Sequence, residues 1–226
     1  MSVIVVPMAR KSVSRLKKSD KPQPVLVLGV TGHRHIARRT RELAALVQAN
    51  LEAIAAANPE ASFTVLSALA EGADRLVVRL ARRILGARLV AVLPMPAVAY
   101  EKDFSSARSR REFRALIETA DRVIEAPILS GGRAWRTRSE ARNHQYAWAS
   151  AYVAKNADIL FALWDGEPAR GTGGTAYVVD WFLAGRTPRR YRMSRAQLRW
   201  GKSAHTRRLI HVNTRTSVVR RRRALL

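Results

Sequence analysis

The chain has 226 residues, of which 47% are hydrophobic, so it can bury a sizeable core. It contains no cysteine, which excludes disulfide bonds, thiolate metal sites and cysteine nucleophiles. A formal net charge of +24 is typical of a partner of polyanions. No stretch approaches the roughly 20 apolar residues needed to span a bilayer, and the N-terminus lacks the pattern of a secretory signal. We therefore expect a soluble, globular, cytoplasmic protein with no membrane span.

The positive charge is concentrated at the two ends of the chain. Residues 1–22 hold six Lys or Arg and one acidic residue, and residues 186–226 hold fourteen Lys or Arg and no acidic residue. Residues 23–185 hold twenty-one basic and sixteen acidic residues, a net charge of only +5. We accordingly expect a basic N-terminal extension (1–22), a folded domain (23–186) and a basic C-terminal extension (187–226). Such extensions either contact RNA, DNA or anionic lipid or are simply solvated, and both interpretations stay open.

Short apolar runs rich in branched residues alternate with helical segments between the two extensions. The expected strands are residues 25–30, 63–68, 87–94, 121–126 and 158–164, with a further strand at 207–212. The expected helices are residues 39–57, 73–85, 105–119, 142–156 and 174–185. Nearly continuous apolar strands separated by helices predict βα repeats. The fold class is therefore α/β: a doubly wound, Rossmann-like, mainly parallel sheet with helices on both faces.

In this architecture ligands bind beyond the carboxyl ends of the strands. Three of the loops expected there contain glycine, within residues 29–34, 67–74 and 164–175. Glycine turns that lead into helices suit an anion, because free amide groups and the helix dipole point toward it. Neither the Walker pattern nor the complete dinucleotide fingerprint is present. The candidate ligand-binding residues are Gly29, Thr31, Gly32, Arg34, Ser67, Glu71, Gly72, Asp74, Asp165, Gly171, Thr172, Gly173, Gly174 and Thr175.

Several of these residues also have a purely structural interpretation. Glycines before a helix often make only a tight turn, and Asp74 suits the first turn of a helix through the dipole. Arg34 suits bidentate phosphate recognition but equally suits an exposed surface. His33 and His35 lack a third ligand in range, so we expect no metal site.

"SALAEGADRL" (67–76) and "GTGGTAYVVDWFLAGR" (171–186) resemble the paired loops of the SLOG superfamily, which unites the DNA-processing protein DprA with the Lonely-Guy enzymes. "GVTGHR" and "YEKDF" also look like bacterial SLOG proteins thought to sense nucleotides. The resemblance covers about residues 24–186 and implies a Rossmann-like sheet that binds a nucleotide or a derivative across these loops. Its most specific positions are Ser67, Gly72, Asp74, Gly171, Gly173, Gly174 and Thr175.

The preferred function under this resemblance is a sensor-type module that binds a nucleotide without chemistry, its phosphate held by loops 29–34, 67–74 and 171–175. DprA-like binding of single-stranded DNA is an alternative. The basic C-terminal segment favours it, but few aromatic residues accompany those charges. No cofactor is implied besides a nucleotide ligand. The nucleobase, the downstream partner and homo-oligomerisation stay open.

Hydrolysis of the N-glycosidic bond of nucleoside monophosphates, as in the Lonely-Guy enzymes, is the second alternative. Aligning Thr175 with the threonine of the Lonely-Guy pattern puts Val178 where the catalytic glutamate belongs. An oxocarbenium-like transition state needs a carboxylate, so this departure weighs against the reaction. Glu71, Asp74 and Asp165 remain as weak catalytic candidates.

Overall fold

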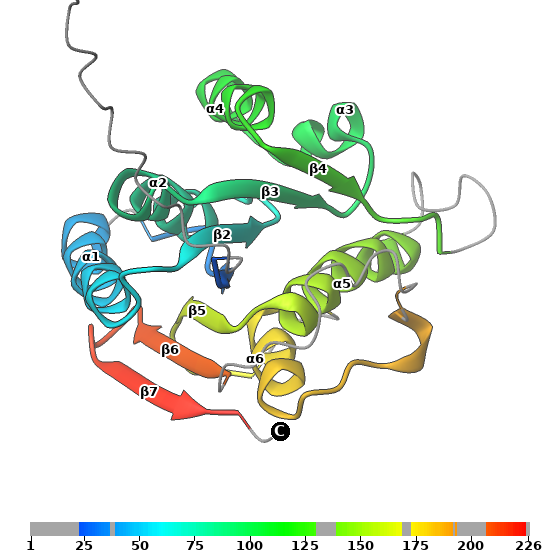
Figure 1. Ribbon diagram of the computed structural model, residues 1–226. Helices are drawn as coiled ribbons and strands as arrows, with labels where there is room; N and C mark the ends of the chain where they lie inside the picture. The colour runs from blue at the N-terminus through cyan, green and yellow to red at the C-terminus, as the bar shows by residue number, and fades with distance from the viewer. Residues whose placement is uncertain are drawn as a thin grey trace, which may run out of the picture.

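The computed structural model describes residues 23–36, 39–129, 139–168, 173–191, 193 and 207–224. The strands in these ranges are β1 (Val25–Gly32), β2 (Ser62–Ser67), β3 (Arg88–Leu93), β4 (Arg122–Glu125), β5 (Ile159–Trp164), β6 (Arg208–Asn213) and β7 (Val219–Arg223). They form one sheet in the order β4-β3-β2-β1-β5-β6-β7 (Figure 1). Neighbouring strands from β4 to β6 pair in parallel, and β7 pairs antiparallel with β6. The chain thus has the doubly wound, mainly parallel α/β fold that the sequence predicts.

Helices cover both faces of this sheet (Figure 1). They are α1 (Thr40–Ala57), α2 (Ala73–Leu85), α3 (Ala97–Tyr100), α4 (Ala107–Glu118), α5 (Ser139–Asn156) and α6 (Thr175–Leu183), with 3-10 turns η2 (Glu101–Asp103) and η4 (Arg189–Tyr191). Leu26 and Leu28 of β1 share a core cluster with α1, α2 and α4, whereas Val27 shares one with α5 and α6. Burial on both faces explains why β1 reads as a continuous apolar run. Within the described residues, no helix combines the length and apolar character needed to cross a membrane.

The predicted elements differ from the structure mainly at their ends. Helix α5 begins at Ser139, three residues before the predicted start at residue 142. The sequence analysis did not predict α3, which spans only four residues and follows Pro96. Short helices carry too few residues to establish a periodic apolar pattern, so such an element is not visible in sequence.

The sheet continues beyond residue 186, where the sequence analysis ended the folded domain. Strand β6 pairs with β5 along its whole length, from Arg208 opposite Ile159 to Asn213 opposite Trp164. Strand β7, which the sequence analysis did not predict, then adds the last edge of the sheet. Residues 207–224 of the expected C-terminal extension therefore belong to the domain. The expected N-terminal extension lies outside the described residues.

Candidate functional site

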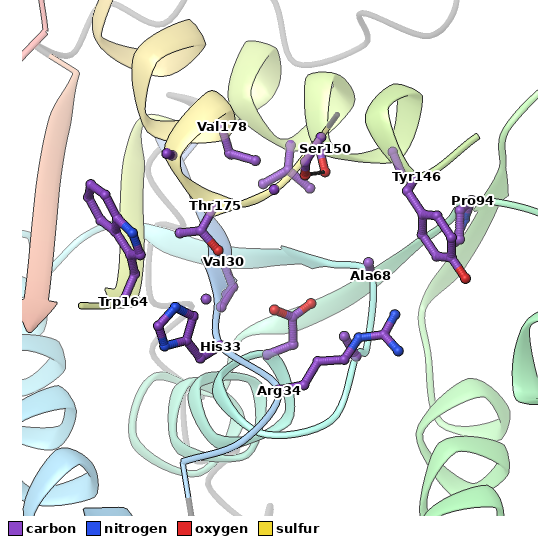
Figure 2. A pocket seen from close by; sticks show the side chains of 18 of the residues that line it. Val30, His33, Arg34, Ala68, Pro94, Tyr146, Ser150, Trp164, Thr175 and Val178 are labelled. Carbon is purple, nitrogen blue, oxygen red and sulfur yellow. Dashed lines mark hydrogen bonds between the residues drawn. The ribbon is translucent and has the colours of Figure 1, made fainter. Parts of the chain in front are cut away.

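A cavity of about 710 Å³ opens at the carboxyl ends of the parallel strands. It lies beside the ends of β1 and β5, where the chain crosses from one half of the sheet to the other. Doubly wound sheets bind their ligands at such a reversal of strand order. Figure 2 shows side chains from the ends of β1 and β5, from the loops after β1 and β2, and from α5 and α6 around one space.

The cavity brings together residues from all three predicted loops. Among the candidates, the ones that line it are Gly32, Arg34, Asp74, Asp165, Gly173, Gly174 and Thr175. Five other candidates do not line it: Gly29, Thr31, Ser67, Glu71 and Gly72. Gly171 and Thr172 lie outside the described residues. The three loops therefore converge on one cavity. Only three of the candidate glycines, Gly32, Gly173 and Gly174, line it, and most of its wall comes from side chains.

Gly72 lies where the loop after β1 packs against the start of α2, and it does not line the cavity. Its φ is +77°, and a Cβ atom at this position would lie 2.2 Å from the carbonyl oxygen of Arg34 and 2.5 Å from that of His33. The neighbouring amide of Ala73 donates to the His33 carbonyl over 3.0 Å. The expectation that the backbone at Gly72 opens toward a ligand is thus corrected. Glycine is needed here because the loop after β1 approaches the start of α2 closely.

Gly29 and Gly32 on β1 also serve close packing. A Cβ atom on Gly29 would lie 2.7 Å from Cβ of Ala157, and one on Gly32 would lie 2.5 Å from both Cβ of Ala73 and the carbonyl oxygen of Leu163. These two glycines let the helices after β2 and before β5 approach the strand. Gly32 additionally leaves its edge of the cavity free of a side chain.

The start of α6 forms the wall opposite the loop after β1 (Figure 2). Gly173 has a φ of +85°, and a Cβ atom there would lie 2.7 Å from Cα of Ala147 on α5. Ser150 Oγ donates to the Gly173 carbonyl over 3.0 Å, which fixes this turn against α5. Gly174 is the N-cap of α6, and no side chain of the described residues caps it. The first amide groups of α6 and the Thr175 hydroxyl are therefore available to an anion in the cavity.

Asp74 is a buried carboxyl group at the cavity wall. Ser67 Oγ donates to Asp74 Oδ2 over 2.9 Å, and the amide of Leu69 donates to Ser67 Oγ over 2.9 Å. Burial raises the pKa of Asp74 to about 6, although the hydrogen bonds from Ser67 and Ala70 and the charge of Arg34 act in the opposite direction. Ser67, a predicted ligand residue, is fully buried and serves to hold Asp74. Near neutral pH, Asp74 can both accept and release a proton.

Arg34 supplies a cation to the cavity. Its guanidinium carbon lies 5.9 Å from the ring centroid of Tyr146, and Figure 2 shows the side chain extending across the cavity toward that ring. The Tyr146 hydroxyl donates to Asp103, which also pairs with Arg142. The tyrosine is therefore held in place beneath the guanidinium. Arg34 is a predicted site residue, whereas Tyr146 lies more than a hundred residues away and has no local sequence signal.

His33 and Asp165 join the ends of β1 and β5. His33 Nε2 lies 3.5 Å from Asp165 Oδ1, and Arg215 Nη2 lies 3.1 Å from Asp165 Oδ2. The Thr214 hydroxyl lies 3.3 Å from His33 Nδ1. Thr214 and Arg215 belong to the turn between β6 and β7, so this turn contacts two residues that line the cavity. Sequence reasoning missed these two residues because it placed them outside the domain.

Trp164 gives the cavity a flat aromatic wall (Figure 2). Its indole Nε1 donates to the carbonyl of Glu167 over 2.8 Å, and its ring lies 4.9 Å from that of His211 at 34°. The orientation of the indole is thus fixed from two sides. Such a plane can stack a nucleobase. In the described residues, no group of three or more His, Asp or Glu side chains is arranged to hold a metal ion.

No family model matches this chain. The comparisons with curated proteins and with solved structures likewise find no match.

Proposed function

We propose that this cavity binds a nucleotide or a nucleotide derivative. The observation that carries the proposal is that one cavity joins a cation, Arg34, the start of α6, which no described side chain caps, and the plane of Trp164. These are the groups that phosphates and bases require. The volume of about 710 Å³ lies within the range of small-molecule sites.

The anionic part of the ligand would lie between Arg34 and the first turn of α6. Arginine recognises phosphate oxygens through two parallel hydrogen bonds, and the amides at a helix start add donors and a favourable dipole. Thr175 supplies a hydroxyl on the same wall (Figure 2). The base would stack on Trp164. Carboxylates in such sheets commonly accept hydrogen bonds from ribose hydroxyls, a role that suits Asp165.

The test is a thermal-shift and calorimetric titration of the full chain with nucleoside mono-, di- and triphosphates. A ligand that binds only the folded state raises its stability by an amount that grows with ligand concentration. We expect saturable binding that Arg34→Gln weakens about 10-fold or more, since charge-assisted hydrogen bonds contribute about 1.5 to 3 kcal/mol. Arg83→Gln, on an exposed position of α2 outside the cavity, is the matched control. Equal affinities of the two variants, or no binding of any nucleotide, would contradict the proposal.

A second candidate function is hydrolysis of the bound nucleotide, and Asp74 is the observation that favours it. A buried carboxyl group with a pKa of about 6 suits general acid or base catalysis near neutral pH. The release of free base from nucleoside monophosphates, followed by chromatography, tests this activity. It should be lost in Asp74→Asn while nucleotide binding persists. Absence of free base with every nucleotide that binds would leave binding alone as the function.

A further inference from the structure

A row of arginines lies along the outer edge of the sheet, where β7 is the second strand beyond β5. Strand β7 ends in four consecutive arginines, and Arg208 of β6 lies directly opposite Arg223. All five side chains are exposed. We call Arg208, Arg220, Arg221, Arg222 and Arg223 the arginine edge. Figure 1 shows β7 as the last strand of the sheet, with no helix or strand of the described residues beyond it.

The strand register distributes these charges over both faces of the sheet. Paired residues of an antiparallel ladder point to the same face, and successive residues point to opposite faces. Arg221 and Arg223 therefore share the face of Ile210 and Arg208, toward α1. Arg220 and Arg222 occupy the other face. A chain lying along the edge would meet guanidinium groups on both sides of β7.

A groove of about 240 Å³ accompanies the first of these faces. It lies between α1 and β6–β7, and no acidic side chain of the described residues lines it. Arg221 Nε and Nη2 both donate to Asn50 Oδ1, over 3.1 and 2.8 Å, which holds this guanidinium at the groove. The Arg221 side chain is therefore preorganised at the groove in the absence of a ligand.

The side chains of the other four arginines of the edge have no hydrogen-bond or ion-pair partner among the described residues. Other arginines of the same segment differ in this respect. Arg207 donates to the carbonyl oxygens of Ala157 and Phe182, and Arg215 pairs with Asp165. Within the part of the chain that the structure describes, the charge of these four side chains is therefore uncompensated, which is the arrangement expected where a partner supplies the anions.

We propose that the arginine edge binds the phosphate backbone of a nucleic acid without reading its sequence. Guanidinium groups match phosphate oxygens in geometry, and a linear row of them matches a linear polyanion. A membrane surface fits less well, because peripheral binding buries an apolar face, and the apolar residues at the start of β7 are Val219 and, just before the strand, Val218. The proposal does not depend on the cavity or on the nucleotide ligand proposed for it.

Charge on an edge strand also prevents pairing with other chains, and the experiment separates that role from binding. Arg208→Gln, Arg220→Gln, Arg222→Gln and Arg223→Gln are combined in the full chain, which leaves the Asn50-bound Arg221 intact. The control combines Arg83→Gln, Arg88→Gln, Arg108→Gln and Arg111→Gln, which removes the same charge from exposed positions of α2, β3 and α4. Fluorescence anisotropy then follows binding of a labelled oligothymidylate and of a duplex of the same length between about 50 and 200 mM salt.

We expect the edge variant to lose affinity on the order of 10-fold or more and the control to lose much less. For the single strand, loss of four phosphate contacts makes the salt slope shallower by about 3, at about 0.7 for each contact. Equal losses in the two variants, or no loss in either, would overturn the proposal, as would edge-dependent binding to phosphatidylserine vesicles with none to either nucleic acid. If the fourfold variant does not fold, two double variants replace it and its control. The edge variant is then Arg220→Gln with Arg222→Gln, the control is Arg108→Gln with Arg111→Gln, and the expected change in salt slope is half as large.

Discussion

His33 Nε2 lies 3.5 Å from Asp165 Oδ1 and so connects the ends of two strands that are more than a hundred residues apart in the chain. The same carboxylate receives Arg215 from the β6–β7 turn over 3.1 Å. One acidic side chain thus holds three segments at the mouth of the cavity. This carboxylate can serve either to bind a ligand or only to hold the three segments together.

Asp165→Asn separates these two roles. The side chains of His33 and Arg215 are 37% and 61% exposed, so loss of the carboxylate should change the free energy of unfolding by no more than about 1 kcal/mol. If Asp165 accepts a hydrogen bond from a bound ribose, nucleotide affinity falls about 10-fold. Urea unfolding and calorimetric titration measure the two quantities. A large loss of stability with unchanged affinity would assign Asp165 a structural role only.

The pH dependence of stability reports on Asp74. Its pKa of about 6 in the folded protein lies above the ordinary 3.8, so the folded state holds the proton more tightly than the unfolded chain. Its contribution to the free energy of unfolding is therefore complete below about pH 4 and is lost as the pH rises through about 6, on the order of 3 kcal/mol in total.

Asp74→Asn should remove this contribution, because an amide does not titrate. Urea unfolding between pH 4 and pH 8 compares the variant with the natural protein and with Asp180→Asn, which makes the same change on the exposed side of α6. We expect the difference between Asp74→Asn and the natural protein to vary with pH in this window. A difference independent of pH would show that Asp74 titrates at its ordinary value.

Gly72 and Gly86 flank α2 and provide a matched pair for the cost of a Cβ atom. Both have a left-handed φ, +77° and +59°, but a Cβ atom on Gly72 meets the Arg34 carbonyl oxygen at 2.2 Å and one on Gly86 meets nothing within 4 Å. Gly86→Ala should therefore lower the free energy of unfolding by about 1 kcal/mol from backbone strain alone. Gly72→Ala should lower it by about 3 kcal/mol or more, since the loop after β1 must move. Equal effects would contradict the close approach of the two loops.

Arg75 is buried beneath the loop after β2. Its Nε donates to the Leu69 carbonyl over 3.0 Å, its Nη1 to Ser109 and Glu112, and its guanidinium lies 4.5 Å from the ring centroid of Phe104. Lysine cannot reproduce this planar set of donors.

Arg75→Lys should accordingly lower the free energy of unfolding by about 3 kcal/mol. Arg79 contacts the same Glu112 but is exposed, so Arg79→Lys should change it by less than about 0.5 kcal/mol. Chemical denaturation of both variants checks the ratio. Similar values would mean that burial adds little at Arg75.

Part of the cavity could be predicted from the sequence, because the strand pattern fixes where the loops meet. Runs such as 25–30 and 158–164 are apolar because both faces of the sheet are covered, and parallel strands place their carboxyl ends at one edge. The loops after β1, β2 and β5 therefore had to meet, and three of the predicted site residues, Arg34, Asp74 and Thr175, line the cavity between them. Tyr146 and Ser150 were not predicted, because they lie within a helix whose orientation toward the cavity leaves no pattern in the chain.

The sequence by itself determined the alternation of strands and helices and the positions of the three loops, since apolar periodicity and turn residues are local properties. Only the tertiary structure decided what the glycines do: Gly72 and Gly173 have left-handed backbones that fit against other segments, at distances that no local pattern encodes. It also decided that residues 219–223 add a seventh strand, antiparallel to the strand that the sequence predicts at 207–212. An arginine-rich edge strand resembles a solvated tail in sequence, because its stability comes from the backbone hydrogen bonds of β6 and not from burial of its own side chains.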